Sequence, residues 1–277
     1  MHLNELDYTI VFLPPPLVRA CSSCPTSPKL LFTLHPHTQL QVFAGFTLHF
    51  SLFTNLITAT NIHKKFGQVE ILKGVDIRVE KAQVVSIVGA SGAGKTTLLH
   101  ILGTLDTMTE AEGSSLMING IDVKKLSAKK LAQFRNEHIG FIFQFHQLLP
   151  EFTALENVCI PAFIKGTSRQ VAEHRAKELL DYLGLSHRLS HKPDALSGGE
   201  QQRVAVARAL MNQPAVIFAD EPSGNLDSES AQQLHQLFFS LRDAFAQTFV
   251  IVTHNTQLAQ MADKTFTMQD GRLMTND

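Results

Sequence analysis

The stretch GASGAGKTTLLHILG, residues 89–103, joins a glycine-rich loop to a lysine, two threonines and the start of an apolar pattern with helical spacing. It matches G-x-x-x-x-G-K-[S/T] in full, and a β-branched run at 84–88 precedes it as a buried strand would. Glycines let such a loop curl so that successive N–H groups face one anion, and the following helix adds its positive end. The sequence therefore predicts a phosphate-binding loop between a strand and a helix.

Each position of this loop has an expected task. We expect Lys95 to reach the β- and γ-phosphates of a nucleotide, the Thr96 hydroxyl to ligate Mg²⁺, and Thr97 to help with the α-phosphate. The predicted nucleotide-binding loop consists of Gly89, Ala90, Ser91, Gly92, Ala93, Gly94, Lys95, Thr96 and Thr97.

A matching pair of acids lies in PAVIFADEPS, residues 214–223, where four apolar residues precede Asp220 and Glu221. A buried strand would bring both carboxylates to the carboxyl edge of a parallel sheet, where α/β proteins place their sites. Alone, an apolar run that ends in acid is a weak signal. Together with the phosphate loop, it predicts that Asp220 holds Mg²⁺ through water and that Glu221 is the general base for an attacking water.

Two further strand ends carry polar residues of the same kind. FVIVTHNTQLA predicts a strand over 249–252 that ends at Thr253 and His254, and we interpret His254 as a sensor of the γ-phosphate. GFIFQFHQLLP predicts another strand that ends at Gln144, whose amide is suited to ligate Mg²⁺ or to orient the water. Without the phosphate loop, each residue would be an ordinary polar strand end.

A second candidate phosphate-binding helix start lies in LSGGEQQRVAVARAL, which begins at Leu196. Ser197, Gly198 and Gly199 precede a predicted helix, so the serine is a cap and the glycines leave backbone amides bare. One nucleotide does not easily need both loops from one subunit. The sequence therefore predicts two chains packed head to tail, each offering this segment to the triphosphate held by its partner.

These motifs, in this order, resemble those of the nucleotide-binding subunits of ABC transporters over roughly residues 57–277. Phe66 stands where the family has an adenine-stacking aromatic, commonly tyrosine, and it keeps the stacking face. The LSGGE segment (196–200, ending at Glu200) and SGNLD (223–227) match the family's signature and the loop that links the two sites of the dimer. The resemblance implies a homodimeric, Mg²⁺-dependent ATPase, an enzyme of the translocase class.

The same resemblance implies an α/β fold, a P-loop NTPase with a RecA-like parallel-sheet core, an antiparallel β edge subdomain and an inserted helical subdomain at about 145–205. Within that insert, SRQVAEHRAKELLDYLGL has apolar residues at helical spacing, which we interpret as core packing. These residues are Val171, Ala172, Ala176, Leu179, Leu180 and Leu183. The insert is expected to receive a coupling helix from a membrane subunit.

A finer resemblance rests on FIFQFHQLLPEFTALENVCIPAFI (141–164) and DEPSGNLD (220–227), which look like the ATPases that power lipoprotein release from the bacterial inner membrane. It implies integral membrane permease subunits as partners and peripheral association with the cytoplasmic face of that membrane. The alternatives are the ATPase of a macrolide-exporter-type or cell-division-type complex, and a non-transport ABC ATPase. A scaffold that binds ATP without turnover is disfavoured by Glu221 and His254.

Composition limits the other function classes. The chain has 277 residues, 44% hydrophobic and 18% charged, so it is globular, and its formal net charge of −1 gives no global positive field for nucleic acid. Three cysteines (Cys21, Cys24 and Cys159) make no disulfide framework, which fits a reducing compartment.

Residues 1–56 differ from the rest: they carry six of the eleven prolines and only four charged side chains. Three hypotheses remain open. The segment is a targeting or membrane segment, although the start is slightly acidic and prolines interrupt it; it is half of a zinc site, formed by Cys21, Cys24, His35 and His37; or it is a non-native extension, disordered or produced by a misplaced start codon, with Leu56 as the natural first residue. We favour the third.

Overall fold

The computed structural model describes residues 55–275. Strands and helices alternate along most of this range, as expected for an α/β protein. The strands are β1 (Asn55–Phe66), β2 (Val69–Glu80), β3 (Val84–Gly89), β4 (Ser115–Ile118), β5 (Ile121–Asp122), β6 (Ile139–Phe143), β7 (Val216–Asp220), β8 (Thr248–Val252), β9 (Lys264–Gln269) and β10 (Arg272–Thr275). The α-helices are α1 (Lys95–Leu102), α2 (Ala128–His138), α3 (Ala154–Lys165), α4 (Arg169–Tyr182), α5 (Gly198–Leu210), α6 (Ser228–Phe245) and α7 (Thr256–Met261).

The central sheet has six strands in the order β10-β9-β3-β8-β7-β6, and every pair is parallel except β10 with β9. The four strands β3, β8, β7 and β6 are therefore neighbours that run in one direction. Because the carboxyl ends of parallel strands meet at one edge, the segments that follow these four strands are brought together. Those segments are the four that the sequence predicted to carry the site.

Two hydrophobic cores lie on the two faces of this sheet. In β7, Val216 and Phe218 pack into the core shared with α1 and the second sheet, whereas Ile217 and Ala219 pack into the core shared with α3 to α6. Strand β8 divides its residues in the same way. Strands buried on both faces need continuous apolar runs, which is why these segments do not alternate with polar residues.

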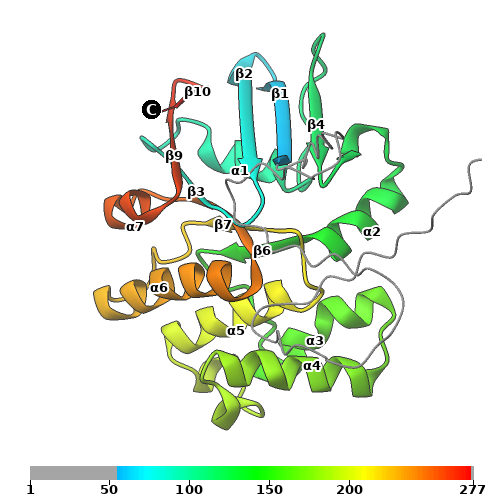
Figure 1. Cartoon of the computed structure of the whole chain (residues 1–277), viewed down its shortest axis with the longest axis vertical. Coiled ribbons are helices and arrows are strands. Elements are labelled where there is room, and N and C mark those ends of the chain that lie inside the picture. The colour runs from blue at the N-terminus through cyan, green and yellow to red at the C-terminus, as the bar shows by residue number, and fades with distance from the viewer. Residues whose placement is uncertain (1–54, 276–277) are drawn as a thin grey trace, which may run out of the picture. The chain divides into compact units, whose positions relative to one another are not determined.

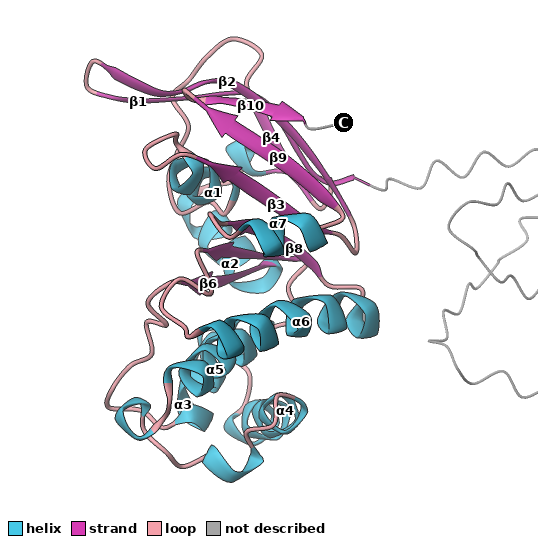
Figure 2. Cartoon of the chain, turned by 90° about the vertical axis from the view of Figure 1, so that its left-hand side faces the viewer, coloured by secondary structure: helices cyan, strands magenta, loops and turns pink. Residues whose placement is uncertain are grey.

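The second sheet is antiparallel, with the order β2-β1-β4-β5. Figure 2 shows α1 and α2 on the side of the central sheet that faces this second sheet. Leu98, Leu99 and Ile101 of α1 are buried between the two sheets. The predicted antiparallel edge subdomain is confirmed.

The helical subdomain lies on the opposite side of the central sheet, where Figures 1 and 2 place α3, α4 and α5 beside α6. It is inserted between β6 and β7, as the sequence predicted. Ala172, Ala176 and Leu180 of α4 are buried in its core. The prediction was wrong for Val171, whose side chain is 60% exposed, because a residue next to Ala172 in a helix is turned about 100° away from the buried face.

The hypotheses about residues 1–54 lie outside the described residues, and with them Cys21, Cys24, His35 and His37. The last two residues of the predicted extension, Asn55 and Leu56, begin β1, and Leu56 is buried. Cys159, on α3, is a buried free thiol, and burial raises its pKa to about 11. Among residues 55–275, none of the helices has the length and apolar character that crossing a membrane requires.

Candidate functional site

The loop after β3 has a backbone that only glycine fits at its first position. Gly89 has a φ of +150°, and a Cβ there would lie 2.2 Å from the carbonyl oxygen of Met268 on the neighbouring strand β9. At the other end, Gly94 has a φ of +103° and precedes the first residue of α1. The loop is therefore held against the sheet at one end and turned directly into a helix at the other.

Lys95 is buried at the start of α1 and folds back over this loop. Its Nζ donates hydrogen bonds to the carbonyl oxygens of Gly89, at 2.9 Å, and Ala90, at 3.0 Å. The ammonium is thus fixed beside the loop without a carboxylate partner among the described residues. A cation held in this way keeps its charge available for an anion that the loop binds.

Thr96 and Asp220 meet across the gap between α1 and the end of β7. The Thr96 hydroxyl donates to Oδ1 of Asp220 at 3.2 Å. Burial raises the pKa of Asp220, and the hydrogen bond from Thr96 opposes that rise. The structure therefore places next to each other two of the three side chains that the sequence predicted to serve the same metal ion, the third being Gln144.

Glu221 lies in a tight turn directly after β7. Its φ is +46°, which is uncommon for a residue other than glycine. Its backbone N–H donates to the carbonyl oxygen of Val252 at 2.9 Å. The carboxylate oxygen Oε2 accepts a hydrogen bond from the backbone N–H of His254 at 3.3 Å. The imidazole Nδ1 of His254 lies 2.9 Å from the same oxygen.

Gln144, directly after β6, is bonded to the loop that follows Glu221. Its amide Nε2 donates to Oδ1 of Asn225 at 3.0 Å, and Nδ2 of Asn225 donates to the backbone carbonyl of Gln144 at 3.2 Å. Gly224 makes room for this pair, since a Cβ there would lie 2.9 Å from the Gln144 amide nitrogen. No pattern in the sequence predicts this contact with Asn225.

The segment Ser197–Glu200 forms a complete capping box at the start of α5. The Ser197 hydroxyl accepts from the Glu200 N–H at 3.2 Å, and the Glu200 carboxylate accepts from the Ser197 N–H at 2.8 Å. This backbone hydrogen bond, followed by the hydrogen bond from Arg188, lowers the pKa of Glu200. Gly198 is exposed and Gly199 partly so, which leaves the first backbone amides of α5 accessible, as the sequence predicted.

The phosphate loop and the α5 segment belong to different parts of the chain. Helix α1 packs into one core and α5 into the other, on opposite faces of the central sheet (Figure 1). The side-chain hydrogen bonds of Ser197 and Glu200 stay within the helical subdomain. The structure therefore gathers the loop, Asp220, Glu221, His254 and Gln144 at one edge, and leaves the α5 segment in another subdomain.

Phe66 ends β1 with its ring 55% exposed, and Nζ of Lys64 lies 4.9 Å from the ring centroid. That ammonium also donates to Oδ1 of Asp106 and to the carbonyl oxygen of Thr107, both at 2.7 Å. One face of the ring is thus occupied by a cation that is itself fixed. An exposed aromatic ring is suited to stack on a flat ring such as a purine.

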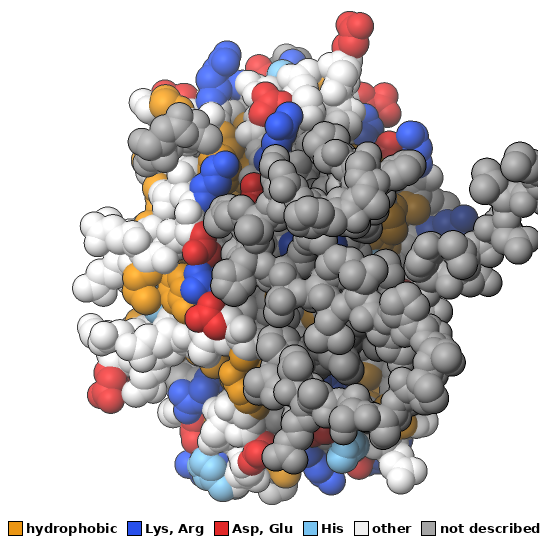
Figure 3. All heavy atoms as spheres, viewed as in Figure 1, with side chains coloured by type: hydrophobic (Ala, Val, Ile, Leu, Met, Phe, Trp, Pro, Cys, Tyr) orange, Lys and Arg blue, Asp and Glu red, His pale blue; other side chains and the backbone are white. Residues whose placement is uncertain are grey.

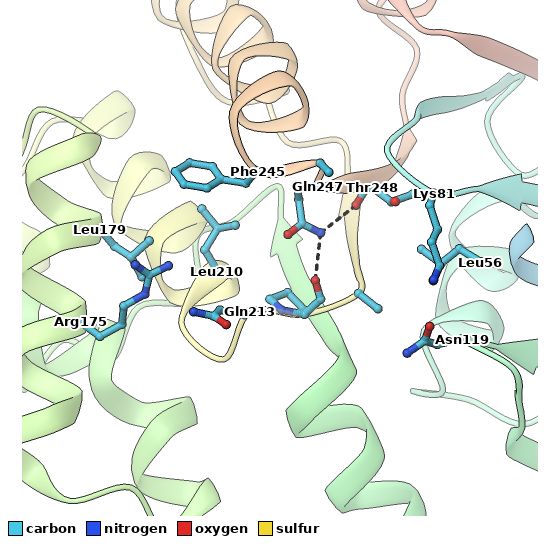
Figure 4. Close-up of a pocket in the computed structure, with 13 residues that line it drawn as sticks. Leu56, Lys81, Asn119, Arg175, Leu179, Leu210, Gln213, Phe245, Gln247 and Thr248 are labelled. Carbon is cyan, nitrogen blue, oxygen red and sulfur yellow. Dashed lines mark hydrogen bonds between the residues drawn. The ribbon is translucent and has the colours of Figure 1, made fainter. Parts of the chain in front are cut away.

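A cavity of about 400 Å³ lies elsewhere, beside the residues at which β7 and β8 begin. Figure 4 shows it between Arg175 and Leu179 on one side and Lys81 and Leu56 on the other. The candidate site is at the carboxyl ends of the same strands, so this cavity is no part of it. On the coloured part of the surface in Figure 3, acidic and basic side chains are interspersed.

The parallel sheet, the loop between β3 and α1, and the carboxylates after β7 define a P-loop nucleotide-binding protein. The family model described as "ABC transporter" matches residues 72–224. The chain belongs to the ABC transporter ATP-binding family, and it is an ATPase of that family.

Curated relatives and solved structures agree with this assignment. The lipoprotein-releasing system ATP-binding protein LolD of Bacteroides fragilis is 59% identical over 219 residues, which are 79% of this chain and 100% of the relative. LolD of Cytophaga hutchinsonii is 57% identical, over 78% of this chain and 97% of its own length. The dimeric bacterial ABC transporter cassette MJ0796 is similar in structure, with a TM-score of 0.71 and 38% identity, over 80% of this chain and 99% of that one. The same cassette has also been solved as a dimer in a post-hydrolysis state with ADP and Pi.

Proposed function

We propose that this chain is the ATP-hydrolysing subunit of an ABC transporter that powers the release of lipoproteins from the bacterial inner membrane toward the outer membrane. The observation that carries the proposal is the identity of 57–59% to LolD proteins over nearly their whole length. The alternatives, a macrolide-exporter-type or cell-division-type ATPase and a non-transport ABC ATPase, use the same nucleotide site. They differ from this proposal in what the ATPase drives.

The residues at the carboxyl edge of the sheet support an assignment of roles in hydrolysis. Backbone amides of residues 89–97 and the Lys95 ammonium bind the phosphates of ATP, and the exposed ring of Phe66 stacks on the adenine. Glu221 takes a proton from the attacking water, since it is the partly exposed carboxylate directly beyond β7. His254 orients that carboxylate and senses the γ-phosphate, and Gln144 orients the water.

Mg²⁺ is the expected cofactor. The side chains of the site fit a metal ion that is held largely by the phosphates of the bound ATP. No group of three or more His, Cys, Asp or Glu side chains within 55–275 is arranged to hold a metal ion. Mg²⁺ usually takes one or two carboxylates together with phosphate oxygens and water. Thr96, Asp220 and Gln144 are the residues that would hold it, and when bound it neutralises charge on the transferred phosphate.

The active form is proposed to be a head-to-tail homodimer. In one subunit the segment Ser197–Glu200 lies in a different subdomain from the phosphate loop, so its accessible amides have no triphosphate of their own to bind. A second copy would supply that triphosphate. ATP would thereby join the two subunits, and hydrolysis would separate them.

The segment after Gln144 is the proposed contact with a membrane permease. Phe145 is 71% exposed, and Leu149 and Phe152 are also exposed, which is unusual for three large apolar side chains within eight residues. A coupling helix of a permease would cover them. The subunit would then sit peripherally on the cytoplasmic face of the inner membrane, held by its permease.

The deciding experiment is cargo release by the full chain, co-expressed with its membrane subunits and reconstituted in vesicles. We expect ATP-dependent release of an acylated lipoprotein from the vesicles, and no stimulation of ATP hydrolysis by the same protein without its lipid. The Glu221→Gln variant should not release the lipoprotein. Release or ATPase stimulation by a macrolide instead of the lipoprotein would assign the chain to the exporter class.

A further inference from the structure

A buried glutamine on α5 connects three segments of the site. Gln202 has no exposed surface, and it lies two residues beyond Glu200. Its amide nitrogen Nε2 donates to the carbonyl oxygen of Pro222 at 2.7 Å and to that of Phe143 at 3.3 Å. Its oxygen Oε1 is hydrogen-bonded to Nδ1 of His146.

The chemistry of these partners fixes the orientation of the amide. Both carbonyl oxygens only accept hydrogen bonds, so the NH₂ group of Gln202 has to face them. Oε1 then faces the imidazole, which means that Nδ1 of His146 carries the proton. Both donors of the amide and its acceptor are therefore used, and none of the three partners can be kept by an apolar side chain.

The three partners flank the residues that act on ATP. Phe143 immediately precedes Gln144, His146 follows it by two residues, and Pro222 immediately follows Glu221. Gln202 therefore links the backbones next to Gln144 and Glu221 inside the protein. Asn225 links the same two segments at the surface.

A second residue of α5 strengthens the connection to the segment after Gln144. The partly buried guanidinium of Arg208 donates to the carbonyl oxygens of His146, at 2.9 Å, and Gln147, at 2.6 Å. The helix that carries these two side chains begins at Ser197–Glu200. In the proposed dimer, α5 presents its first turn to the partner subunit. Further along, the same helix holds the residues around Gln144.

We propose that Gln202 is a positioning residue for ATP hydrolysis, which sets the distance between the Gln144 segment and the Glu221 turn and ties both to α5. This inference rests on the proposed roles of Gln144 and Glu221. Gln202 does not touch ATP, so its removal should leave nucleotide binding intact and slow the chemical step. A small displacement is enough to matter, since misplacing a catalytic group by about 1 Å costs on the order of 100-fold in rate.

The chain offers a matched control for this substitution. Gln247 is also a buried glutamine whose amide nitrogen donates to two backbone carbonyls, those of Pro214 and Thr248, both at 3.2 Å. Figure 4 shows both hydrogen bonds. They lie where β7 and β8 begin, whereas the candidate site lies where these strands end. Gln247→Leu should therefore cost similar stability without touching the geometry around Glu221.

The experiment compares Gln202→Leu with Gln247→Leu in the full chain, measuring Tm, ATP affinity, KM and kcat. For Gln202→Leu we expect kcat to fall roughly 10- to 100-fold with an ATP affinity within about twofold of wild type. Gln247→Leu should lower Tm by a similar amount and keep kcat. Equal kcat in the two variants, or a rise in KM with kcat unchanged, would overturn the proposal.

A second variant keeps the test decisive if Gln202→Leu does not fold. Gln202→Glu preserves the volume and the acceptor for His146, but a carboxylate cannot donate to the carbonyls of Phe143 and Pro222, so kcat should fall again. A Gln202→Glu protein with wild-type kcat would overturn the proposal. Combining either variant with Asn225→Ala should give a non-additive loss, because both side chains hold the same two segments together. If Lys95→Ala left ATP binding unchanged, the proposed site itself would fail, which is a separate outcome.

Discussion

His254 contacts one oxygen of Glu221 twice, through its backbone N–H at 3.3 Å and its imidazole Nδ1 at 2.9 Å. The two residues follow β8 and β7, which are neighbouring parallel strands. Glu221 is therefore restrained by the next strand while its side chain remains partly accessible. His254 itself is largely exposed, with a side chain 73% accessible.

Replacing the proposed base should separate binding from hydrolysis. Glu221→Gln keeps the side-chain shape and leaves Asp220 in place, so it should bind Mg-ATP normally. Its kcat should fall about 100- to 10,000-fold, the usual contribution of a positioned general base. Single-turnover hydrolysis measures this, with Glu229→Gln on the exposed start of α6 as the control. A variant that hydrolysed ATP at the wild-type rate would remove Glu221 from its role.

Removing the loop cation should weaken nucleotide binding itself. Within residues 55–275, the ammonium of Lys95 is held by the carbonyls of Gly89 and Ala90 and has no carboxylate partner, so its charge is free to interact with phosphate. A hydrogen bond to a charged group contributes about 1.5–3 kcal/mol, so Lys95→Ala should weaken ATP binding roughly 10- to 150-fold. Titration calorimetry compares it with Lys81→Ala, an exposed lysine beside the cavity in Figure 4. Equal affinities would mean that this loop is not the binding site.

The head-to-tail dimer predicts complementation between two inactive variants. Gly198→Glu fits its own chain, where the nearest atom to a new Cβ is 3.7 Å away on Leu226, but it places a negative charge at the exposed start of α5. At an ATP concentration near the wild-type Kd, Lys95→Ala and Gly198→Glu should each hydrolyse little ATP alone.

A mixture of the two variants should recover activity, because each mixed dimer contains one site with an intact Lys95 and an intact Gly198. Random pairing of equal amounts gives mixed dimers about half of the time, each with one of two sites, so about a quarter of wild-type activity is the ceiling. Two copies of the same variant, mixed in the same way, are the control. A mixture as inactive as its components would contradict a site shared between subunits.

Phe66 should contribute to ATP affinity through its ring alone. Stacking of a base on an aromatic side chain contributes about 1–3 kcal/mol, so Phe66→Ala should weaken ATP binding roughly 5- to 150-fold. Phe66→Tyr retains the ring, and its affinity should match the wild type. Fluorescent-nucleotide titration measures all three proteins. An alanine variant with unchanged affinity would place the adenine elsewhere.

The capping box of α5 predicts a pH-dependent difference in stability. The pKa of Glu200 is lowered in the folded protein, first by the Ser197 N–H and then by Arg188, so its ionised form stabilises the fold. That stabilisation is fully present above the unfolded pKa, about 4.3, and is lost as pH falls through the lower folded pKa.

The variant Glu200→Gln should therefore be less stable than wild type at pH 7, by about 0.3–1 kcal/mol, as for other charges at helix starts. The difference should shrink towards zero as pH falls below about 4, in the window that ends at the folded pKa. Urea denaturation at pH 7 and at a pH below about 4 measures this difference in stability. Glu151→Gln, in an exposed loop, is the reference for losing a carboxylate. A difference that is the same at both pH values would contradict the assigned cause.

Much of this site was predictable because the residues that bind phosphate must follow strands of a parallel sheet. The apolar runs before Gly89, Gln144, Asp220 and His254 predicted four strands that end at one edge, and the structure has those strands as neighbours. The order of the strands could not be read from the sequence, since β8 separates β3 from β7 although it comes later in the chain.

The contacts that join these segments could not be predicted, because they depend on which helix packs beneath which loop. Gln202 lies within the polar run EQQR (200–203) near the start of α5, and the sequence shows neither its burial nor its three partners. The error at Val171 has a related origin. The helical spacing shows that α4 has a buried face, but the width of that face is set by the neighbouring helices α3 and α5.

The division of β7 between two cores also limits how the gene can vary. Shifting this strand by one residue would turn Val216 and Phe218 towards α5 and Ile217 and Ala219 towards α1, and would carry Asp220 about 3.3 Å along the strand, away from Thr96. Apolar exchanges that respect volume are tolerable there. An in-frame codon gained or lost within 216–219 is not, so natural variation in this stretch should consist of substitutions and never of length changes.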